Sequence, residues 1–161
     1  MTPSFILVDT NVWHFALVKP KEQEFSEIHA SAKKFLLNVL SNRDFRIAFS
    51  SYHVAELLEV LGKSGIDVET RIKLLQDFKT AKFYVKELLP ETVEKALIHS
   101  FESRIHIYDY LTVYPLEGVV IQIFSADQHL QHPHFKKVAE VVNPLHPWIL
   151  QEGVKPKKQK P

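Results

Sequence analysis

Two aspartates stand directly behind the two most apolar segments of the chain. Asp9 follows the run Phe5-Ile6-Leu7-Val8, and Asp127 ends the tripeptide Ser125-Ala126-Asp127 that follows Val119–Phe124. Such runs predict strands buried on both faces of a parallel sheet, and ligands of such sheets bind outside the carboxyl ends of the strands. One aspartate at this position is also typical of a helix N-cap. Two of them on neighbouring strands bring like charges together, which is costly unless a cation lies between them.

Two further acids are expected near the same edge of the sheet. Glu56 lies about one turn into the helix after the second predicted strand, and a rise of ~1.5 Å per residue keeps it near the end of that strand. Asp109 lies on a short predicted helix, just before the strand Val119–Phe124. Each of these acids alone is also typical of a solvated helix face. Four carboxylates together predict a site for a hard cation, Mg²⁺ or Mn²⁺, whose usual partner is a phosphate.

The elements that must position these acids alternate between strands and helices. Strands are predicted at Phe5–Val8, Arg46–Phe49, Phe83–Val85, Val119–Phe124 and, as an edge strand, Val138–Val142. Helices are predicted from caps at Thr10-Asn11, over Phe25–Val39, from caps at Ser50-Ser51 to Gly62 or Gly65, over Asp67–Lys79, from Pro90, and over Tyr108–Tyr114. The alternation implies right-handed βαβ units and a parallel sheet of about five strands, covered by helices on both faces.

The spacing of apolar residues also predicts which face of each helix is buried. On the helix over Asp67–Lys79, the inward positions are predicted to be Val68, Ile72, Leu75 and Phe78. On the helix that Pro90 opens, the apolar positions are Val93, Leu97 and Phe101. We expect one domain over residues 1–150 and a disordered Lys- and Pro-rich tail over residues 151–161.

Composition excludes several classes of protein. With 161 residues, 45% apolar and 24% charged, the chain is expected to be globular, and the absence of Cys excludes disulfide scaffolds, zinc ribbons and cysteine nucleophiles. A net charge of +1 means that any nucleic-acid binding must depend on local basic groups. No apolar run approaches the ~20 residues of a membrane span, and the N-terminus lacks the pattern of a signal peptide. A cytoplasmic protein with no membrane partner is expected.

The ordered motifs of the chain resemble those of the PIN domain family, including the VapC-type toxin ribonucleases. The resemblance covers roughly Phe5 to Leu145. The residues that carry it are Leu7-Val8-Asp9-Thr10-Asn11, Ala55-Glu56, Asp109 and Phe124-Ser125-Ala126-Asp127. It implies a three-layer α/β/α sandwich and a metal-dependent endoribonuclease that hydrolyses RNA phosphodiester bonds, with a water activated by one or two metal ions.

Carried over by position, the resemblance also assigns roles to single residues. Asp9, Glu56, Asp109 and Asp127 would form the catalytic, metal-binding quartet for Mg²⁺ or Mn²⁺, with Asn11 and Ser125 as supporting polar residues. Asp9 and Asp127 would be direct ligands. The resemblance further implies a homodimer and an antitoxin protein that blocks the site by presenting Arg to the carboxylates. The chain departs from the family pattern at Tyr108, Tyr110 and Tyr114, which are predicted to crowd Asp109, and in its extra length near Val18–Phe25 and in the tail.

Other functions are compatible with parts of this pattern. A haloacid-dehalogenase-like phosphatase also begins with an apolar strand that ends in Asp, but it needs a second Asp two positions later, where this chain has Asn11. A receiver-type domain needs paired acids directly after the first strand. A PIN-like binding or scaffold module without activity stays open, although four clustered acids argue against a degenerate site.

Histidines and lysines give weaker signals. The spacing of His129, His132 and His134 is compatible with a transition-metal site, but a polar loop is the simpler interpretation because Gln131 and Pro133 interrupt the group. We expect a capping or surface role for His14 and His53, which could also approach the acids. Four tail lysines could follow an RNA backbone or serve solubility alone; they are Lys155, Lys157, Lys158 and Lys160.

Overall fold

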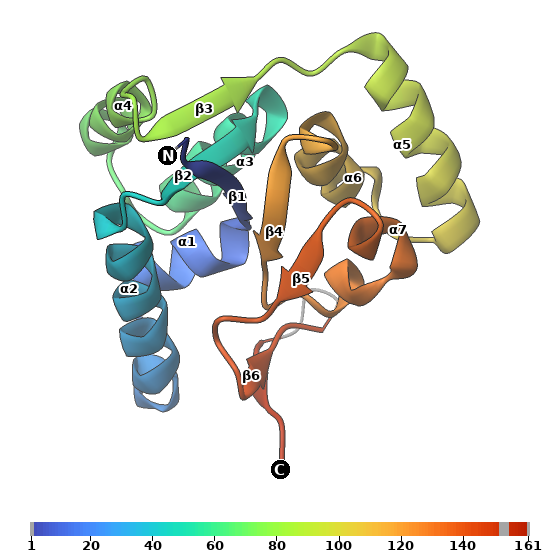
Figure 1. The fold of residues 1–161 in the computed structure, drawn as a ribbon. Coiled ribbons are helices and arrows are strands. Elements are labelled where there is room, and N and C mark those ends of the chain that lie inside the picture. Colours follow the sequence, from blue (N-terminus) through green and yellow to red (C-terminus); the bar gives the residue numbers. More distant parts are fainter. Residues whose placement is uncertain (1, 152–154, 161) are drawn as a thin grey trace.

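A computed structural model describes residues 2–151 and 155–160 of the chain. Its centre is a five-stranded sheet in the order β3-β2-β1-β4-β5 (Figure 1). The strands are β1 (Ser4–Val8), β2 (Phe45–Ser50), β3 (Phe83–Lys86), β4 (Val120–Phe124) and β5 (Glu140–Val142). All four neighbouring pairs are parallel. The predicted parallel sheet is therefore confirmed, with β5 at its edge.

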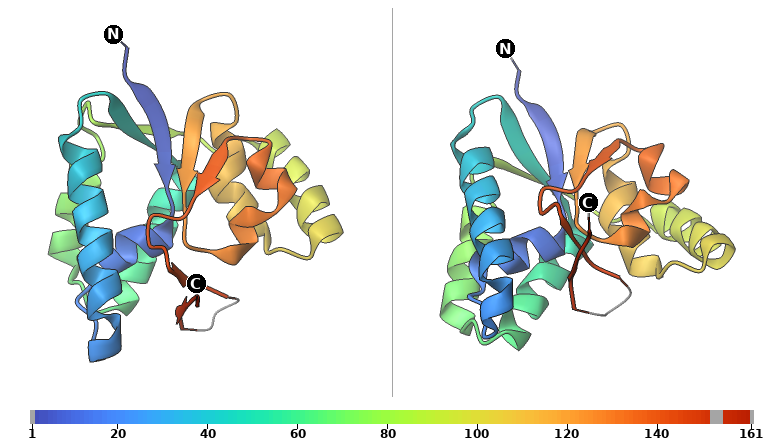
Figure 2. Two further views of the ribbon diagram at one scale, coloured as in Figure 1. Left: turned by 60° about the horizontal axis from the view of Figure 1, so that its bottom comes forward. Right: turned by 90° about the horizontal axis from the view of Figure 1, so that it is seen from below.

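Helices cover both faces of this sheet (Figure 2). One layer contains α1 (Thr10–Leu17), α2 (Ser26–Ser41), α3 (Ser51–Lys63) and α4 (Val68–Asp77). The other contains α5 (Pro90–Ser103), α6 (Ile107–Val113) and α7 (Pro133–Lys136). Short 3₁₀ turns span Gln23–Phe25, Tyr114–Leu116 and Gln128–Gln131. The predicted three-layer α/β/α sandwich is confirmed.

Alternate residues of the central strand enter two separate cores. Ile6 and Val8 of β1 pack with the α1–α4 layer, whereas Leu7 packs with the α5–α7 layer. All three side chains are buried. Because side chains of a strand point alternately to the two faces, a strand between two cores must be apolar at every position. This is why β1 could be recognised from its continuous apolar run.

Most of the predicted helix boundaries are confirmed, and one cap is corrected. The side chain of Ser50 caps α3, and this helix ends at Lys63, before Gly65 with its φ of +94°. The helix after β1 is capped by Asp9 itself, and not by the predicted Thr10-Asn11. Both of these residues already belong to α1, so their side chains are available for other contacts.

The predicted inward face is wrong for α5 and half wrong for α4. On α4, Val68 and Ile72 are 56% and 49% exposed, whereas Leu75 packs partly buried against the core and Phe78, just beyond the end of the helix, is buried. On α5, the predicted stripe is exposed, with Phe101 at 87%, and the buried residue is Ala96. Both helices lie at the outer ends of their layers, where α4 packs mainly on α3 and α5 mainly on α6. Apolar spacing identifies a stripe, but it does not determine whether another element covers it.

The C-terminal segment folds back towards the domain. β6 (Trp148–Ile149) pairs antiparallel with β7 (Lys157–Lys158). The predicted disordered tail includes residues 152–154 and 161, which lie outside the described residues; at β7 the prediction differs from the structure. The reason is pairing that the tail sequence does not reveal: besides the β6 ladder, Lys155 Nζ lies 2.6 Å from Glu22 Oε1. The domain boundary at residue 150 stays a prediction. No helix in the described ranges is long and apolar enough to cross a bilayer.

His53 lies inside the α1–α4 core, so the predicted capping or surface role is wrong for this residue. It is fully buried against Phe49, and neither ring nitrogen has a hydrogen-bond partner among the described residues. Burial lowers the pKa of His53 from 6.5 to about 3. The folded protein therefore holds a neutral imidazole, whereas the unfolded chain binds a proton below pH 6.5. Folding stability is lost as the pH falls through this range.

Replacing His53 with Leu should stabilise the protein. At pH 7, removal of a buried, unpaired polar ring should raise the free energy of unfolding by about 1 kcal/mol. Between pH 6.5 and 4 the gain should increase by roughly 1 kcal/mol per pH unit, because the unfolded state of the variant no longer takes up this proton. Urea denaturation followed by circular dichroism at pH 7, 6 and 5 measures both effects. A gain that does not depend on pH would contradict the assignment of a buried neutral ring.

Candidate active site

Four acidic side chains from four different elements line one cavity of about 320 Å³. Asp9 follows β1 and Asp127 comes after β4, both at the carboxyl ends of their strands. Glu56 lies in the second turn of α3, and Asp109 lies in the first turn of α6. The cavity thus contains all four carboxylates that the sequence predicted to lie together. Parallel strands achieve this because their carboxyl ends meet at one edge of the sheet.

Asp9 is held in place by hydrogen bonds to both of its carboxylate oxygens. Oδ1 accepts from the backbone N–H of Thr10 at 2.9 Å, which makes Asp9 the N-cap of α1. Oδ2 accepts from Ser125 Oγ at 2.6 Å and from Asn11 Nδ2 at 3.0 Å. The side chain of Asp9 therefore has little conformational freedom. The residue is 92% buried, and burial disfavours the charged form of its carboxylate.

Asn11 and Ser125 join the end of β1 to the end of β4. Asn11 Oδ1 accepts from the backbone N–H of Ala126 at 3.0 Å, and Asn11 Nδ2 also lies 3.2 Å from Ser125 Oγ. Ser125 Oγ in turn accepts from the backbone N–H of Asp127 at 3.1 Å. These bonds fix the segment that carries Asp127 relative to Asp9. They are the contacts expected of supporting polar residues.

Thr10 positions Glu56, a contact that was not predicted. Its hydroxyl donates to Glu56 Oε2 at 2.8 Å, across 46 residues of sequence. Burial raises the pKa of Glu56, the hydrogen bond from Thr10 lowers it, and the charge of Asp127 raises it again. The Asp-Thr-Asn tripeptide after β1 therefore supplies the acid Asp9. It also supplies hydrogen bonds to Glu56, through Thr10, and to the segment that precedes Asp127, through Asn11.

The tyrosines predicted to crowd Asp109 pack mainly against other residues. Tyr110 and Tyr114 are buried in the α5–α7 core, and the ring of Tyr108 stacks on Tyr52 at a centroid distance of 5.6 Å. Consecutive residues of a helix point in different directions, so aromatic neighbours need not share the face of the acid. Asp109 reaches the cavity without steric conflict.

Burial and mutual repulsion disfavour charge on Asp9 and Asp109. The pKa of Asp9 is raised from 3.8 to about 7 by burial and by the charges of Asp127 and Glu56, although the hydrogen bond from Ser125 lowers it. The pKa of Asp109 is also raised to about 7, by burial and then by the charges of Asp9 and Asp127. A divalent cation would remove this repulsion, and clustered carboxylates are the ligands that Mg²⁺ and Mn²⁺ prefer. The residues present therefore fit the expected ion.

Comparison with known proteins adds evidence on the fold. Neither a family model nor a curated protein matches the sequence. Among solved structures, VapBC2 from Rickettsia felis, bound to a DNA fragment from its promoter, aligns with a TM-score of 0.55 at 18% identity, over 86% of this chain and 98% of that chain. VapC20 from Mycobacterium tuberculosis, a toxin that cleaves the Sarcin-Ricin loop, aligns with a TM-score of 0.55 at 16% identity, over 73% and 86% of the two chains. The chain has the fold of a VapC-type PIN domain.

The three histidines after Asp127 do not form one group; they are His129, His132 and His134. His129 joins the acidic cavity: its Nδ1 lies 3.5 Å from Asp109 Oδ2 and 3.8 Å from Asp127 Oδ1. One ligand atom from each of these three residues lies within 4.8 Å of the other two. His134 instead contacts α5, on another part of the surface. The predicted polar loop is corrected here, because His129 lies in the 3₁₀ turn Gln128–Gln131 and His134 lies on α7. The position of His129 two residues after Asp127 was a signal for its place near the acids, but the sequence did not reveal the turn that directs its side chain.

The metal-free protein should lose stability as the pH rises, and Asp109 should be one cause. Its pKa is about 7 in the folded state against 3.8 for an unperturbed side chain. The folded state therefore keeps a proton that the unfolded chain releases, so this contribution to stability disappears between about pH 4 and 7. In EDTA, Asp109→Asn should raise the melting temperature at pH 7.5 by several degrees and have little effect at pH 4.5.

Thermal unfolding of the wild type and Asp109→Asn in EDTA, at half-unit pH steps, measures this difference. Glu59→Gln is the matched control, because Glu59 is an exposed acid that pairs only with Lys63 at 3.9 Å. Millimolar Mn²⁺ should remove the advantage of Asp109→Asn, since the ion replaces the repulsion with attraction. A constant difference across the pH range would argue against charge repulsion at this position.

Proposed function

We propose that this chain is a metal-dependent endoribonuclease that hydrolyses RNA phosphodiester bonds, and that it is the toxin of a toxin–antitoxin pair. The observation that carries the proposal is the convergence of Asp9, Glu56, Asp109 and Asp127 on one cavity at the carboxyl ends of β1 and β4. Asp9 is buried and the other three acids are partly buried. Four such carboxylates in one cavity repel one another unless a cation compensates their charge, so cation binding is the simplest reason for their convergence.

Each acid would have a role that follows from its support. Asp9 and Asp127 are proposed as direct ligands of Mg²⁺ or Mn²⁺, because their strands and the Asn11–Ser125 hydrogen bonds fix them most rigidly. Glu56, held by Thr10, and Asp109 would complete the shell or orient its waters. When bound, the ion lowers the pKa of water to give a nucleophile and offsets the charge that develops on the phosphate.

A basic groove next to the acids supports RNA as the substrate. A second cavity, of about 510 Å³, shares His14 and Phe15 with the acidic cavity and is also lined by Lys19, Lys21 and Lys63. Its lysines supply the local positive charge that a chain of net charge +1 needs to hold a phosphate backbone. Lys155 of the tail lines this groove too, but it is paired with Glu22. Lys63 is likewise paired with Glu59. We therefore assign phosphate binding to Lys19 and Lys21 before the tail.

The similar structures support the proposed partners. VapC20 cleaves the Sarcin-Ricin loop, and VapBC2 was solved bound to promoter DNA. By this likeness we propose an RNA substrate, a homodimer, a cytoplasmic location and an antitoxin that inserts Arg among the carboxylates. The phosphatase alternative lacks its second acid, because Asn11 stands at that position. The side chain of Asn11 is instead hydrogen bonded to Asp9, Ser125 and Ala126. An inactive binding module would bind the ion without cutting RNA, and the cleavage assay separates it from the nuclease.

Loss of one acid should abolish most of the cleavage without unfolding the protein. Asp109→Asn keeps the shape of the side chain and removes its charge, so cleavage should fall by about 10²-fold or more, and Asp9→Asn should do at least as much damage. Glu59→Gln, one helical turn after Glu56 and exposed, should cleave like the wild type. The assay is Mn²⁺-dependent cleavage of mixed RNA with EDTA as the blank, after circular dichroism has confirmed folding. An inactive Glu59→Gln together with an active Asp109→Asn would refute the assignment of Asp109 to the catalytic site. An inactive wild type would refute the nuclease and favour the binding module without activity.

The basic groove should contribute to RNA affinity in a salt-dependent way. The double variant Lys19→Gln/Lys21→Gln should bind single-stranded RNA more weakly and lower the slope of log affinity against log salt by up to ~1.4, about 0.7 for each lost phosphate contact. Lys33→Gln/Lys34→Gln removes the same charge from an exposed part of α2 and should leave the slope unchanged. Filter binding in EDTA between 50 and 300 mM salt measures both. Equal slopes for the two variants would exclude the groove as the RNA path.

A further inference from the structure

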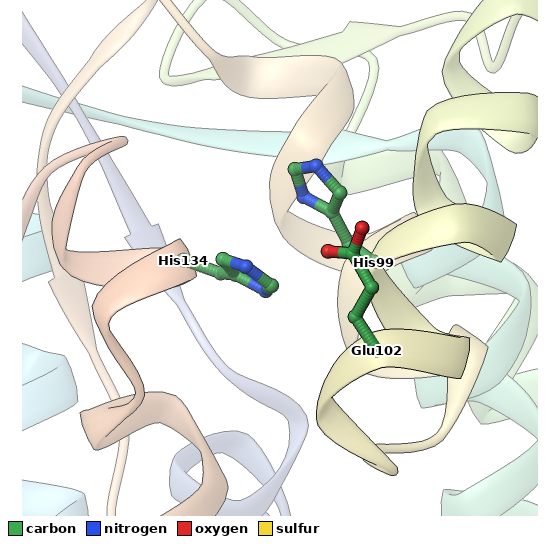
Figure 3. A group of neighbouring side chains, drawn as sticks. All are labelled: His99, Glu102 and His134. Atoms are coloured by element: carbon green, nitrogen blue, oxygen red, sulfur yellow. The ribbon is translucent and has the colours of Figure 1, made fainter.

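A second group of metal-binding side chains lies outside the acidic cavity. His99 and Glu102 are one turn apart on α5, and His134 lies on α7. One ligand atom from each residue lies within 4.8 Å of the other two. Figure 3 shows the side chain of His134 extending from α7 towards α5, where the side chains of His99 and Glu102 lie next to each other. Residues three apart share one face of a helix, so α5 presents an imidazole and a carboxylate together.

Both imidazoles are oriented by buried tyrosines. The hydroxyl of Tyr114 is hydrogen bonded to His99 Nδ1, and that of Tyr110 lies 2.9 Å from His134 Nδ1. Tyr110 is held in turn by Ser103 Oγ at 2.6 Å. Histidines that bind metals commonly use their other ring nitrogen in such a bond, which fixes the tautomer and the ring orientation. Each ring thus keeps Nε2 as a nitrogen that can bind a metal while its bond to tyrosine is retained.

The geometry points to a second metal site, formed by His99, Glu102 and His134, that binds Zn²⁺ or a similar divalent transition-metal ion. Two imidazole nitrogens and one carboxylate oxygen form a donor set that suits zinc and leaves a fourth position for water. The rings of His99 and His134 stack at a centroid distance of 4.3 Å and an interplanar angle of 25°. Zinc–ligand distances of about 2.0–2.2 Å therefore require the two rings to tilt so that both Nε2 atoms face the ion, and the exposed Glu102 to rotate its side chain towards it.

Such an ion would fasten α5 to the rest of the domain. This helix has one buried residue, Ala96, and its main contacts in the described structure are with α6. His134 belongs to a different segment, anchored by the buried Phe135. A metal held by residues of both helices would restrain the outer helix from its C-terminal end. The site is therefore inferred to stabilise the position of α5, and it does not depend on the proposed nuclease activity.

The donor sets of the two sites allow a selective test. The acidic cavity offers four carboxylates and His129, and it can also take up Zn²⁺. Titration of the full-length protein with Zn²⁺ in excess Mg²⁺, followed by calorimetry, measures the new site while Mg²⁺ occupies the acids. Co²⁺ serves as a spectroscopic probe, because tetrahedral nitrogen and oxygen ligands give it intense visible absorption.

The variants His134→Gln and Glu102→Gln test the ligands. We expect one tight Zn²⁺ equivalent for the wild type, an affinity lower by at least about 100-fold for His134→Gln, and a smaller loss for the exposed and structurally harmless Glu102→Gln. His106→Gln is the matched control, since His106 is exposed and its side chain does not cap α6. Asp109→Asn should keep the Zn²⁺ equivalent. If His134→Gln and Glu102→Gln bind Zn²⁺ like the wild type, or if Asp109→Asn loses it, the proposed site is refuted.

Discussion

The structure of the site depends on the hydrogen bonds that hold Asp9 beside the end of β4. An acid that is 92% buried, with other acids nearby, would be expelled towards solvent if its oxygens were free. Ser125, Asn11 and the backbone of Thr10 prevent this by donating to both oxygens of Asp9. The same bonds align the segment that carries Asp127. The hydrogen bonds thus hold the carboxylates close together despite their repulsion. A divalent cation that bound between them would relieve this repulsion without any rearrangement of the backbone.

The sandwich architecture provides the rigidity that this arrangement requires. β1 lies in the middle of the sheet, between β2 and β4, and contributes alternate side chains to both cores. A strand fixed on both faces and both edges cannot shift its register, so the residue that follows it has a precise position. Glu56 and Asp109 arrive from helices in opposite layers, one on each side of the sheet. The acidic cavity therefore exists only where both layers and the central strands meet.

The two groups of side chains proposed to bind metal differ in chemistry and in how they are built. The acidic cavity is supported by strand ends and uses oxygen atoms, whereas the His99 group joins two helices and uses mainly nitrogen. In both, neighbouring hydroxyl groups orient the side chains: Thr10 and Ser125 in the first, Tyr110 and Tyr114 in the second. These hydroxyl contacts connect residues that are between 15 and 116 positions apart in the sequence. They account for why each group converges on one point.

The sequence by itself determined the central strands, the α/β/α layers and the four acids, because these features depend on local patterns. The continuous apolar run of β1 indicates that this strand is buried on both faces of the sheet. An acid directly after such a run must lie at the carboxyl-end edge of the sheet, where ligands bind. The roles of Thr10, His129 and His134 depend on contacts between distant segments, which no local spacing encodes. The exposed stripe of α5 was misjudged for the same reason: an apolar face is a local property, but the element that covers it is not. Only the tertiary structure decided these points, since it alone determines which elements are neighbours.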